Sequence, residues 1–368
     1  MKNNKLTKSI WGLGFVFAAT KWVTLGSVIL LGTGLAQACQ ICVPFPKKSA
    51  ADHLLDSDIV VLAREDADRP FHFRSVAVLK GELDDKAIDL FLDSATRRGL
   101  KAYPQQSVVL VGNAIENRIK WMRVGLTDAK TEPIIRNILK LAPGWVLTPG
   151  NRIDFFTAYL GHENDRIRTL AHLETGRAPY SVIRTLGDAL DREDIRAFLS
   201  DFRSIEWHDL YILLLAQSDN ASDHAYIEQS LRDAARFSTT YRLAAWATAS
   251  IERSGEKTID FLRREYFENA NRKPEELKAV IQAFSVHGTN GHTDLRDRIV
   301  AAYKTLLEVH PAMTLYVVQD AIAWKRTEFT EAIESYSYDN PGVFCGKIAG
   351  ALPCSCPDDK KTDQAIFK

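Results

Sequence analysis

The sequence has no excess of charge of either sign, because 47 lysines and arginines balance 47 aspartates and glutamates. It also contains no polybasic run of the length that binds phosphate backbones. Nucleic acid is therefore not an expected partner. With 46% apolar and 26% charged residues among 368, the composition is that of a folded globular protein and not of a disordered one.

The short motifs that mark common catalytic and cofactor sites are also missing. We find no G-x-S-x-G, no phosphate-binding P-loop and no G-x-G-x-x-G. His162 and Glu163 begin a string typical of zinc proteases, but Arg166 stands where the second histidine ligand is needed. We therefore expect no enzymatic activity, no cofactor and no metal.

One group of potential metal ligands remains in the second half of the chain. His287 and His292 flank the sequence GTNG, and Asp294 follows. Imidazole and carboxylate groups are common zinc ligands. A solvent-exposed turn between helices, rich in Gly and Asn, explains the same residues, and we favour this interpretation.

The N-terminus has the three parts of a secretory signal peptide. A lysine-rich start is followed by an uncharged run from Trp22 to Leu35 and then by Ala36 and Ala38, which form an A-x-A cleavage site. We expect residues 1–38 to be removed and the mature protein, beginning at Cys39, to be secreted or periplasmic.

Two other fates of this segment stay open. A cysteine at the cleavage point is also a site of lipidation, although Ala36 is not the branched apolar residue that this signal usually carries. If the segment is retained, Trp22–Leu35 is shorter than the ~20 residues of a membrane-spanning helix. Joined to Trp11–Thr20 across Lys21 it is long enough, and the protein would then be membrane-anchored.

Cysteine is absent between residues 43 and 344 and occurs only near the two ends, at Cys39, Cys42, Cys345, Cys354 and Cys356. In an oxidising compartment all five are disulfide candidates. The N-terminal pair can bond internally or to the C-terminal trio, and Cys345 can close a local loop. The C-x-x-C spacing also permits a redox or metal role, and all five can in principle bind one metal. The odd number leaves one cysteine free, bonded between chains, or lipidated.

Between Asp58 and Asp128 the apolar residues are spaced as in short strands. Five runs of about five to nine residues, rich in Val, Ile, Leu and Phe, are separated by polar or Gly- and Pro-containing joints. In FHFRSVAVLKG the residues alternate so that one face can be apolar. The spacing predicts a small closed β-barrel, since closure removes exposed strand edges.

The start of this region resembles the netrin-like module of tissue inhibitors of metalloproteinases. The match lies in CQICVPFPKKSAADHLLDSDIVVLARE and FRSVAVLKG, at Cys39, Pro44, Asp58, Val60, Val61, Lys80 and Gly81. The resemblance implies an OB-like barrel over residues 39–130. It also implies that the free amine and carbonyl of Cys39 chelate the zinc of a metalloprotease. The family often has C-x-C where this chain has C-x-x-C, and its barrel cysteines are missing here.

From Glu132 onward the apolar residues follow the helical period, and about eleven or twelve helices are predicted. Such runs of helix pairs stack into solenoids. The segment YLGHENDRIRTLAHLE resembles a HEAT-type turn, with Asp165 opening the second helix and Arg168 one turn later. We divide the chain into a signal peptide (1–38), a netrin-like barrel (39–130), a linker (131–150), a HEAT-like helical domain (151–340) and a cysteine-containing tail (341–368).

These observations predict an α+β multidomain protein with a small OB-like β-barrel followed by an all-α HEAT-like array. We expect it to bind or scaffold an envelope or extracellular protein through a barrel edge and a concave helical face. The alternative is a metalloprotease inhibitor that acts through Cys39. Membrane association is expected only through an uncleaved or lipidated N-terminus.

Overall fold

The computed structural model describes residues 48–84, 86–116, 118–148, 150–187 and 190–339. The expected signal peptide, all five cysteines and the C-terminal tail lie outside these ranges, so what the sequence predicts for them stays a prediction. Within the described ranges no helix is both long and apolar enough to cross a membrane.

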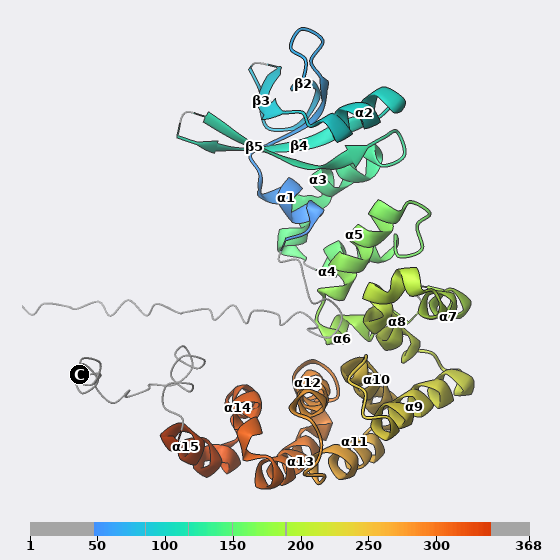
Figure 1. The fold of residues 1–368 in the computed structure, drawn as a ribbon, viewed down its shortest axis with the longest axis vertical. Coiled ribbons are helices and arrows are strands. Elements are labelled where there is room, and N and C mark those ends of the chain that lie inside the picture. Colours follow the sequence, from blue (N-terminus) through green and yellow to red (C-terminus); the bar gives the residue numbers. More distant parts are fainter. Residues whose placement is uncertain (1–47, 85, 117, 149, 188–189, 340–368) are drawn as a thin grey trace, which may run out of the picture. The chain divides into compact units, whose positions relative to one another are not determined.

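Five antiparallel strands form one sheet in the order β3-β2-β1-β4-β5. They are β1 (Ile59–Glu65), β2 (His72–Lys80), β3 (Ala87–Phe91), β4 (Ser107–Ile115) and β5 (Arg118–Thr127). The sheet curls, so that the strands at the two ends of this order, β3 and β5, approach one another (Figure 1).

Helices lie before, between and after the strands in the sequence, which confirms the predicted α+β class. Near the sheet are α1 (Ala50–Asp56), α2 (Ser94–Ala102), α3 (Glu132–Leu147), α4 (Gly150–Thr157) and α5 (Asp165–Gly176). The others are α6 (Tyr180–Ile183), α7 (Arg192–Ser200), α8 (His208–Leu215), α9 (Ala221–Arg236), α10 (Leu243–Ser254), α11 (Glu256–Leu262), α12 (Pro274–Asn290), α13 (Arg296–Val309), α14 (Thr314–Ala323) and α15 (Thr330–Asp339). Short 3-10 or π-helical segments join several of them.

The central strands β1 and β4 are buried on both faces, which explains their unbroken apolar sequences. On one face, Val60 and Leu62 of β1 belong to a core that the sheet shares with α1, α3, α4 and α5. On the other face, Val61 packs with Phe73 and Ile88 in a core built by the strands themselves and α2. The strand region and the first helices are therefore held together by a common apolar core.

Lys80 and Gly81, both part of the netrin-like match, connect the end of β2 to α1 and to the start of β1 respectively. The Nζ of Lys80 donates a hydrogen bond to the carbonyl of Leu55 over 2.6 Å and so satisfies a free carbonyl at the C-terminal end of α1. Gly81 has a φ of 74°, and a Cβ at this position would lie 2.4 Å from the carbonyl oxygen of Asp58. Both residues thus have structural roles.

Residues 131–150, which the sequence assigns to a linker, are for the most part helix α3. Pro143 and Gly144, two of the residues that favoured a linker, lie inside this helix. An internal proline costs a helix about 3 kcal/mol. Helix α3 offsets this cost by burying Ile138 and Trp145 in the core that it shares with the sheet.

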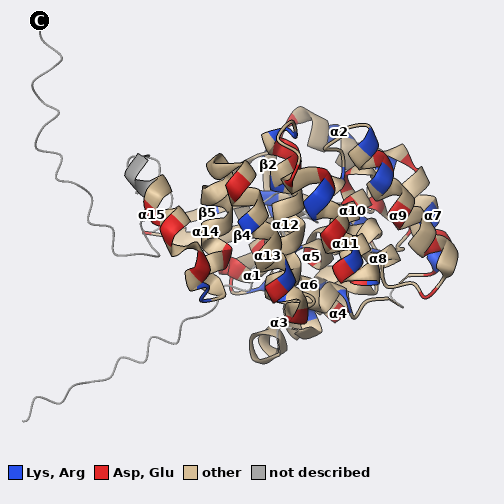
Figure 2. Cartoon of the chain, turned by 90° about the horizontal axis from the view of Figure 1, so that it is seen from below, with Lys and Arg blue, Asp and Glu red and all other residues tan. Residues whose placement is uncertain are grey.

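From α4 to α15 the helices pack on near neighbours in the chain, for example α7 on α8 and α9 on α10 (Figure 1). They enclose two further apolar cores, one centred on α8 and one on α10 to α14. Basic and acidic residues are interspersed over the described elements (Figure 2). This distribution agrees with the balanced composition of the sequence.

Candidate functional site

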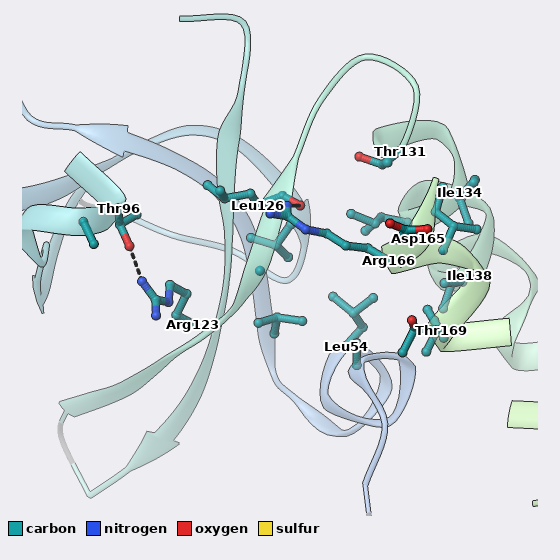
Figure 3. A pocket seen from close by; sticks show the side chains of 18 residues that line it. Leu54, Thr96, Arg123, Leu126, Thr131, Ile134, Ile138, Asp165, Arg166 and Thr169 are labelled. Carbon is teal, nitrogen blue, oxygen red and sulfur yellow. Dashed lines mark hydrogen bonds between the residues drawn. The ribbon is translucent and has the colours of Figure 1, made fainter. Parts of the chain in front are cut away.

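A groove of about 710 Å³ lies where β4 and β5 meet α1, α2, α3 and α5 (Figure 3). Its lining is Ala50, Leu54, Ala95, Thr96, Val109, Arg123, Val124, Gly125, Leu126, Thr131, Ile134, Ile135, Ile138, Asp165, Arg166, Ile167, Thr169 and Leu170. The volume falls within the range of about 300–1,000 Å³ typical of sites for small molecules. We take this groove as the candidate functional site.

Aliphatic side chains form the deep part of the groove. Leu54, Val109, Ile134, Ile138 and Ile167 each expose less than a tenth of their surface. No aromatic ring and no side-chain amide occurs among the described lining residues. The groove therefore offers burial of apolar surface but lacks the stacking platforms that bases and sugars use.

Helical spacing brings these aliphatic residues to one place. Ile134 and Ile138 lie one turn apart on α3, and Ala50 and Leu54 lie one turn apart on α1. Gly125 of β5 is paired with Val109, and a Cβ at Gly125 would have no heavy atom within 4 Å. The absence of a side chain at Gly125 thus keeps part of the groove open.

Two of the three charged residues that line the groove have charged partners. The Nη1 of Arg123 lies 2.7 Å from Asp93 Oδ2 and also bonds to Thr96. Hydrogen bonds from the Thr96 hydroxyl and backbone lower the pKa of Asp93 to about 2. Asp165 pairs with Arg168. These two ion pairs leave no net charge.

Arg166 is the third charged residue, and it forms no ion pair with any residue that the structure describes. Its side chain runs from α5 across the groove towards β5 (Figure 3). There its Nη1 donates to the carbonyl oxygen of Leu126 over 3.2 Å. The groove therefore carries one uncompensated positive charge at its rim.

A network of charges fixes α1, which forms one wall of the groove. Arg152 donates to Asp52 over 2.5 Å and to Glu174 over 2.9 Å, and Arg177 donates to Asp52 over 2.6 Å. Ser49 at the start of α1 also donates to Glu174. Burial by itself raises the pKa of Asp52, but hydrogen bonds from the Ser49 backbone, Arg152 and Arg177 outweigh it and lower this pKa to about 2.

The structure brings His287 and His292 together, with ring centroids 5.7 Å apart, but in a different setting from the expected turn. The interpretation of GTNG as a solvent-exposed turn is wrong, because α12 continues to Asn290 and His287 is fully buried. Gly288 lies inside this helix against Trp324, where a Cβ would approach the indole to 2.2 Å, so the glycine is explained by close packing and not by a turn.

The ring nitrogens of His287 both face protein groups. Nε2 lies 2.9 Å from the carbonyl of Thr248, and Nδ1 accepts from the backbone of His292 over 3.5 Å. Burial lowers the pKa of His287 to about 4, so the ring is neutral at pH 7. Asp294 lies 3.8 Å from His292 Nδ1. No group of three such ligands suited to a metal occurs among the described residues.

A buried carboxyl in the helical region is a second feature that the sequence did not reveal. Asp320 of α14 accepts hydrogen bonds from Ser285 over 2.6 Å and from Tyr303 over 2.8 Å. Burial raises the pKa of Asp320 to about 6, although both bonds act in the opposite direction. No cation pairs with it among the described residues, so it acts as a structural acceptor that titrates near neutral pH.

Asp165 is the first residue of α5, as the sequence predicts, and it forms an ion pair with Arg168 one turn later. Arg168 also donates to the carbonyl of His162 over 2.7 Å, which closes the preceding turn. His162 and Glu163 lie in that turn, and Glu163 pairs with Lys130 over 2.8 Å. These contacts give the residues of the incomplete zinc motif structural roles.

Comparison of the chain with models of protein families, with curated proteins and with solved structures finds no match.

Proposed function

We propose that this chain is an exported binding protein of the cell envelope, which holds an apolar part of its partner in the groove between the sheet and α1, α3 and α5. The observation that carries the proposal is the groove itself. It has a mainly aliphatic lining and stays unfilled at Gly125, although close packing of these side chains would be favourable. Apolar grooves of this volume are typical of binding sites.

An OB-like, netrin-like barrel is part of this proposal. It is supported by the pairing of β1 with both β2 and β4, by the approach of β3 to β5, and by the position of α2 between β3 and β4. In this proposal the barrel supplies one rigid wall of the groove. Rigid elements hold binding residues more accurately than loops do.

We also propose that α4 to α15 form a HEAT-like array that presents a second contact surface to an envelope or extracellular protein. The packing of near-neighbour helices and the Asp165–Arg168 pair support this part. Residues 1–38 remain the proposed signal peptide, with membrane anchoring as the alternative.

Inhibition of a metalloprotease through Cys39 stays the second candidate. It rests on the netrin-like resemblance and requires a free amine at Cys39. One residue added before Cys39 should then abolish inhibition of a zinc protease, whereas binding in the groove should be unaffected. Equal inhibition by the protein with and without the added residue would exclude this mechanism.

Site-specific photo-crosslinking in cells tests binding in the groove. A benzophenone amino acid replaces Thr169 at the rim in the full-length chain, and Glu82, which follows β2 away from the groove and outside α4 to α15, serves as an exposed control position. We expect a crosslinked partner from position 169 that disappears in a Gly125→Leu background. The same products from both positions, or from 169 with and without Gly125→Leu, would contradict the proposal.

A further inference from the structure

We propose that the groove binds a free long-chain fatty acid, with the acyl chain among the aliphatic residues and the carboxylate on Arg166. This inference rests on the proposed function, because it names the ligand of the same groove. It assigns a chemical class to a site that is otherwise defined only by its shape.

The composition of the walls selects an acyl chain. Ligands with aromatic rings, bases or sugars are usually held by aromatic stacking or by many polar groups. The described lining contains neither aromatic rings nor amides, and its buried residues are Leu, Ile and Val together with Thr96 and Thr131, whose hydroxyls bond to other protein groups. A saturated or singly unsaturated chain needs only such surface, and each methylene that enters it gains by leaving water.

The net charge of the lining favours a ligand that carries a single negative charge. Arg123 is neutralised by Asp93, and Asp165 is neutralised by Arg168. Arg166 alone stays uncompensated among the described lining residues. One carboxylate therefore neutralises the positive charge of Arg166. A neutral ligand leaves this charge unpaired, and a multiply charged head group brings more negative charge than Arg166 can neutralise.

The position of Arg166 is compatible with this role. A guanidinium has five N–H donors in one plane, and only one bond from Arg166 is used, from Nη1 to the carbonyl of Leu126. The remaining donors can hold a carboxylate with two bonds. Figure 3 shows the side chain lying across the groove, beside Asp165 and in front of the aliphatic residues. A ligand with its chain inside would bring its head group to this place.

Most of the affinity should come from the chain and a smaller part from the charge, because Arg166 is exposed to solvent. Burial of a methylene corresponds to about a fourfold gain in affinity. An exposed ion pair adds up to about fivefold. Affinity should thus rise with chain length until the groove is full, and an acid should bind up to about fivefold tighter than the alcohol of equal length.

Isothermal titration calorimetry of the full-length protein with decanoate, dodecanoate, tetradecanoate and tetradecanol tests the inference. Four proteins are compared: wild type, Gly125→Leu, Arg166→Gln and the control Arg264→Gln, which changes an exposed arginine on another element. We expect one acid per chain, tighter binding of longer acids, and the acid preferred over the alcohol. Arg166→Gln should remove this preference and leave the affinity for the alcohol unchanged. Gly125→Leu should weaken both ligands at least tenfold, and Arg264→Gln neither.

Several results would overturn the inference. They are equal affinity of the wild type for acid and alcohol, unchanged binding by Gly125→Leu, or no binding of any acid. A Gly125→Leu protein that has lost its wild-type melting temperature is replaced by Ile135→Trp, which fills the groove from α3. Binding to phosphatidylglycerol vesicles without binding of free acids would point to a lipid surface and also refute the proposal. Absence of any crosslink from position 169 in the otherwise wild-type chain refutes the proposed function, whereas failure of the acids alone refutes only this ligand.

Discussion

The network around Arg152 makes a quantitative prediction, because it holds α1 against the helices. Replacement of Arg152 by Met removes three hydrogen bonds, one to Asp52 and two to Glu174. The side chain of Glu174 is 3% exposed and that of Asp52 is 14% exposed, so both carboxylates would stay buried with fewer partners. Arg177 is the remaining cation that contacts them.

The cost follows from the burial of the two carboxylates. Breaking a buried ion pair by removal of one partner costs about 3–5 kcal/mol, and the lower end applies because Arg152 is a quarter exposed. Arg152 is one of several groups that lower the pKa of Asp52 to about 2, and the Ser49 backbone and Arg177 still contact Asp52 in the variant. We therefore expect Arg152→Met to lower the free energy of unfolding by about 3 kcal/mol.

Urea denaturation followed by circular dichroism measures this loss. The matched control is Arg136→Met, since Arg136 pairs with Glu132 on the exposed side of α3, where about half of the arginine is open to solvent. The control should lose less than about 1 kcal/mol. Equal losses in the two variants would refute the reasoning. Because α1 carries Ala50 and Leu54, Arg152→Met should also weaken any ligand of the groove.

Three further predictions concern other parts of the chain. The pKa of Asp320 is raised from 3.8 to about 6, so the contribution of Asp320 to stability should be full below about pH 4 and should be lost, by up to about 3 kcal/mol, as the pH rises through 6. Asp320→Asn should remove this contribution from the pH profile measured by urea titration, and a profile that the substitution leaves unchanged would contradict the assignment. Gly288→Ala should lower the free energy of unfolding by about 1–3 kcal/mol because the new Cβ meets Trp324, whereas the control Gly99→Ala in α2, whose Cβ meets nothing within 4 Å, should be neutral or stabilising. Similar melting temperatures of the two variants would show that the contact with Trp324 is unimportant. A fragment of residues 39–147 should melt at a higher temperature than one of residues 39–130, because α3 completes the core on one face of the sheet. Equal melting temperatures would mean that α3 does not stabilise the strand region.

The pattern of the sequence was sufficient for the secondary-structure classes and for the position of the change between them. The runs around Val60 and Val109 are apolar at every position because β1 and β4 have a core on each face, and such runs are readily recognised as strands. The helical period after Glu132 is equally clear, since each helix buries one stripe.

Local composition gave wrong predictions of helix ends where the packing of buried residues determines the structure. Pro143 and Gly144 usually end helices, but the burial of Trp145 keeps α3 intact beyond them. Gly288 and its neighbours have the composition of a turn, yet Trp324, distant in the sequence, packs on Gly288 and requires a small residue in a helix. Single-sequence patterns contain no information about such distant neighbours.

The groove could not be predicted for a related reason. Its walls come from α1, β5, α3 and α5, and Leu54 and Ile167, which are far apart in the chain, share one core there. The partners of Arg152, and the lack of an acidic partner for Arg166 among the described residues, likewise depend on three-dimensional contacts. From the sequence alone, only the regular spacing of aliphatic residues within each helix could be recognised.

Native mass spectrometry of protein isolated from the exported fraction of cells, as wild type and as Gly125→Leu, tests the central claim most directly. We predict that both chains begin at Cys39, that the wild type carries a non-covalently bound apolar molecule or partner, and that the Gly125→Leu protein does not. Nothing bound to either protein, or the same added mass bound to both, would contradict the account.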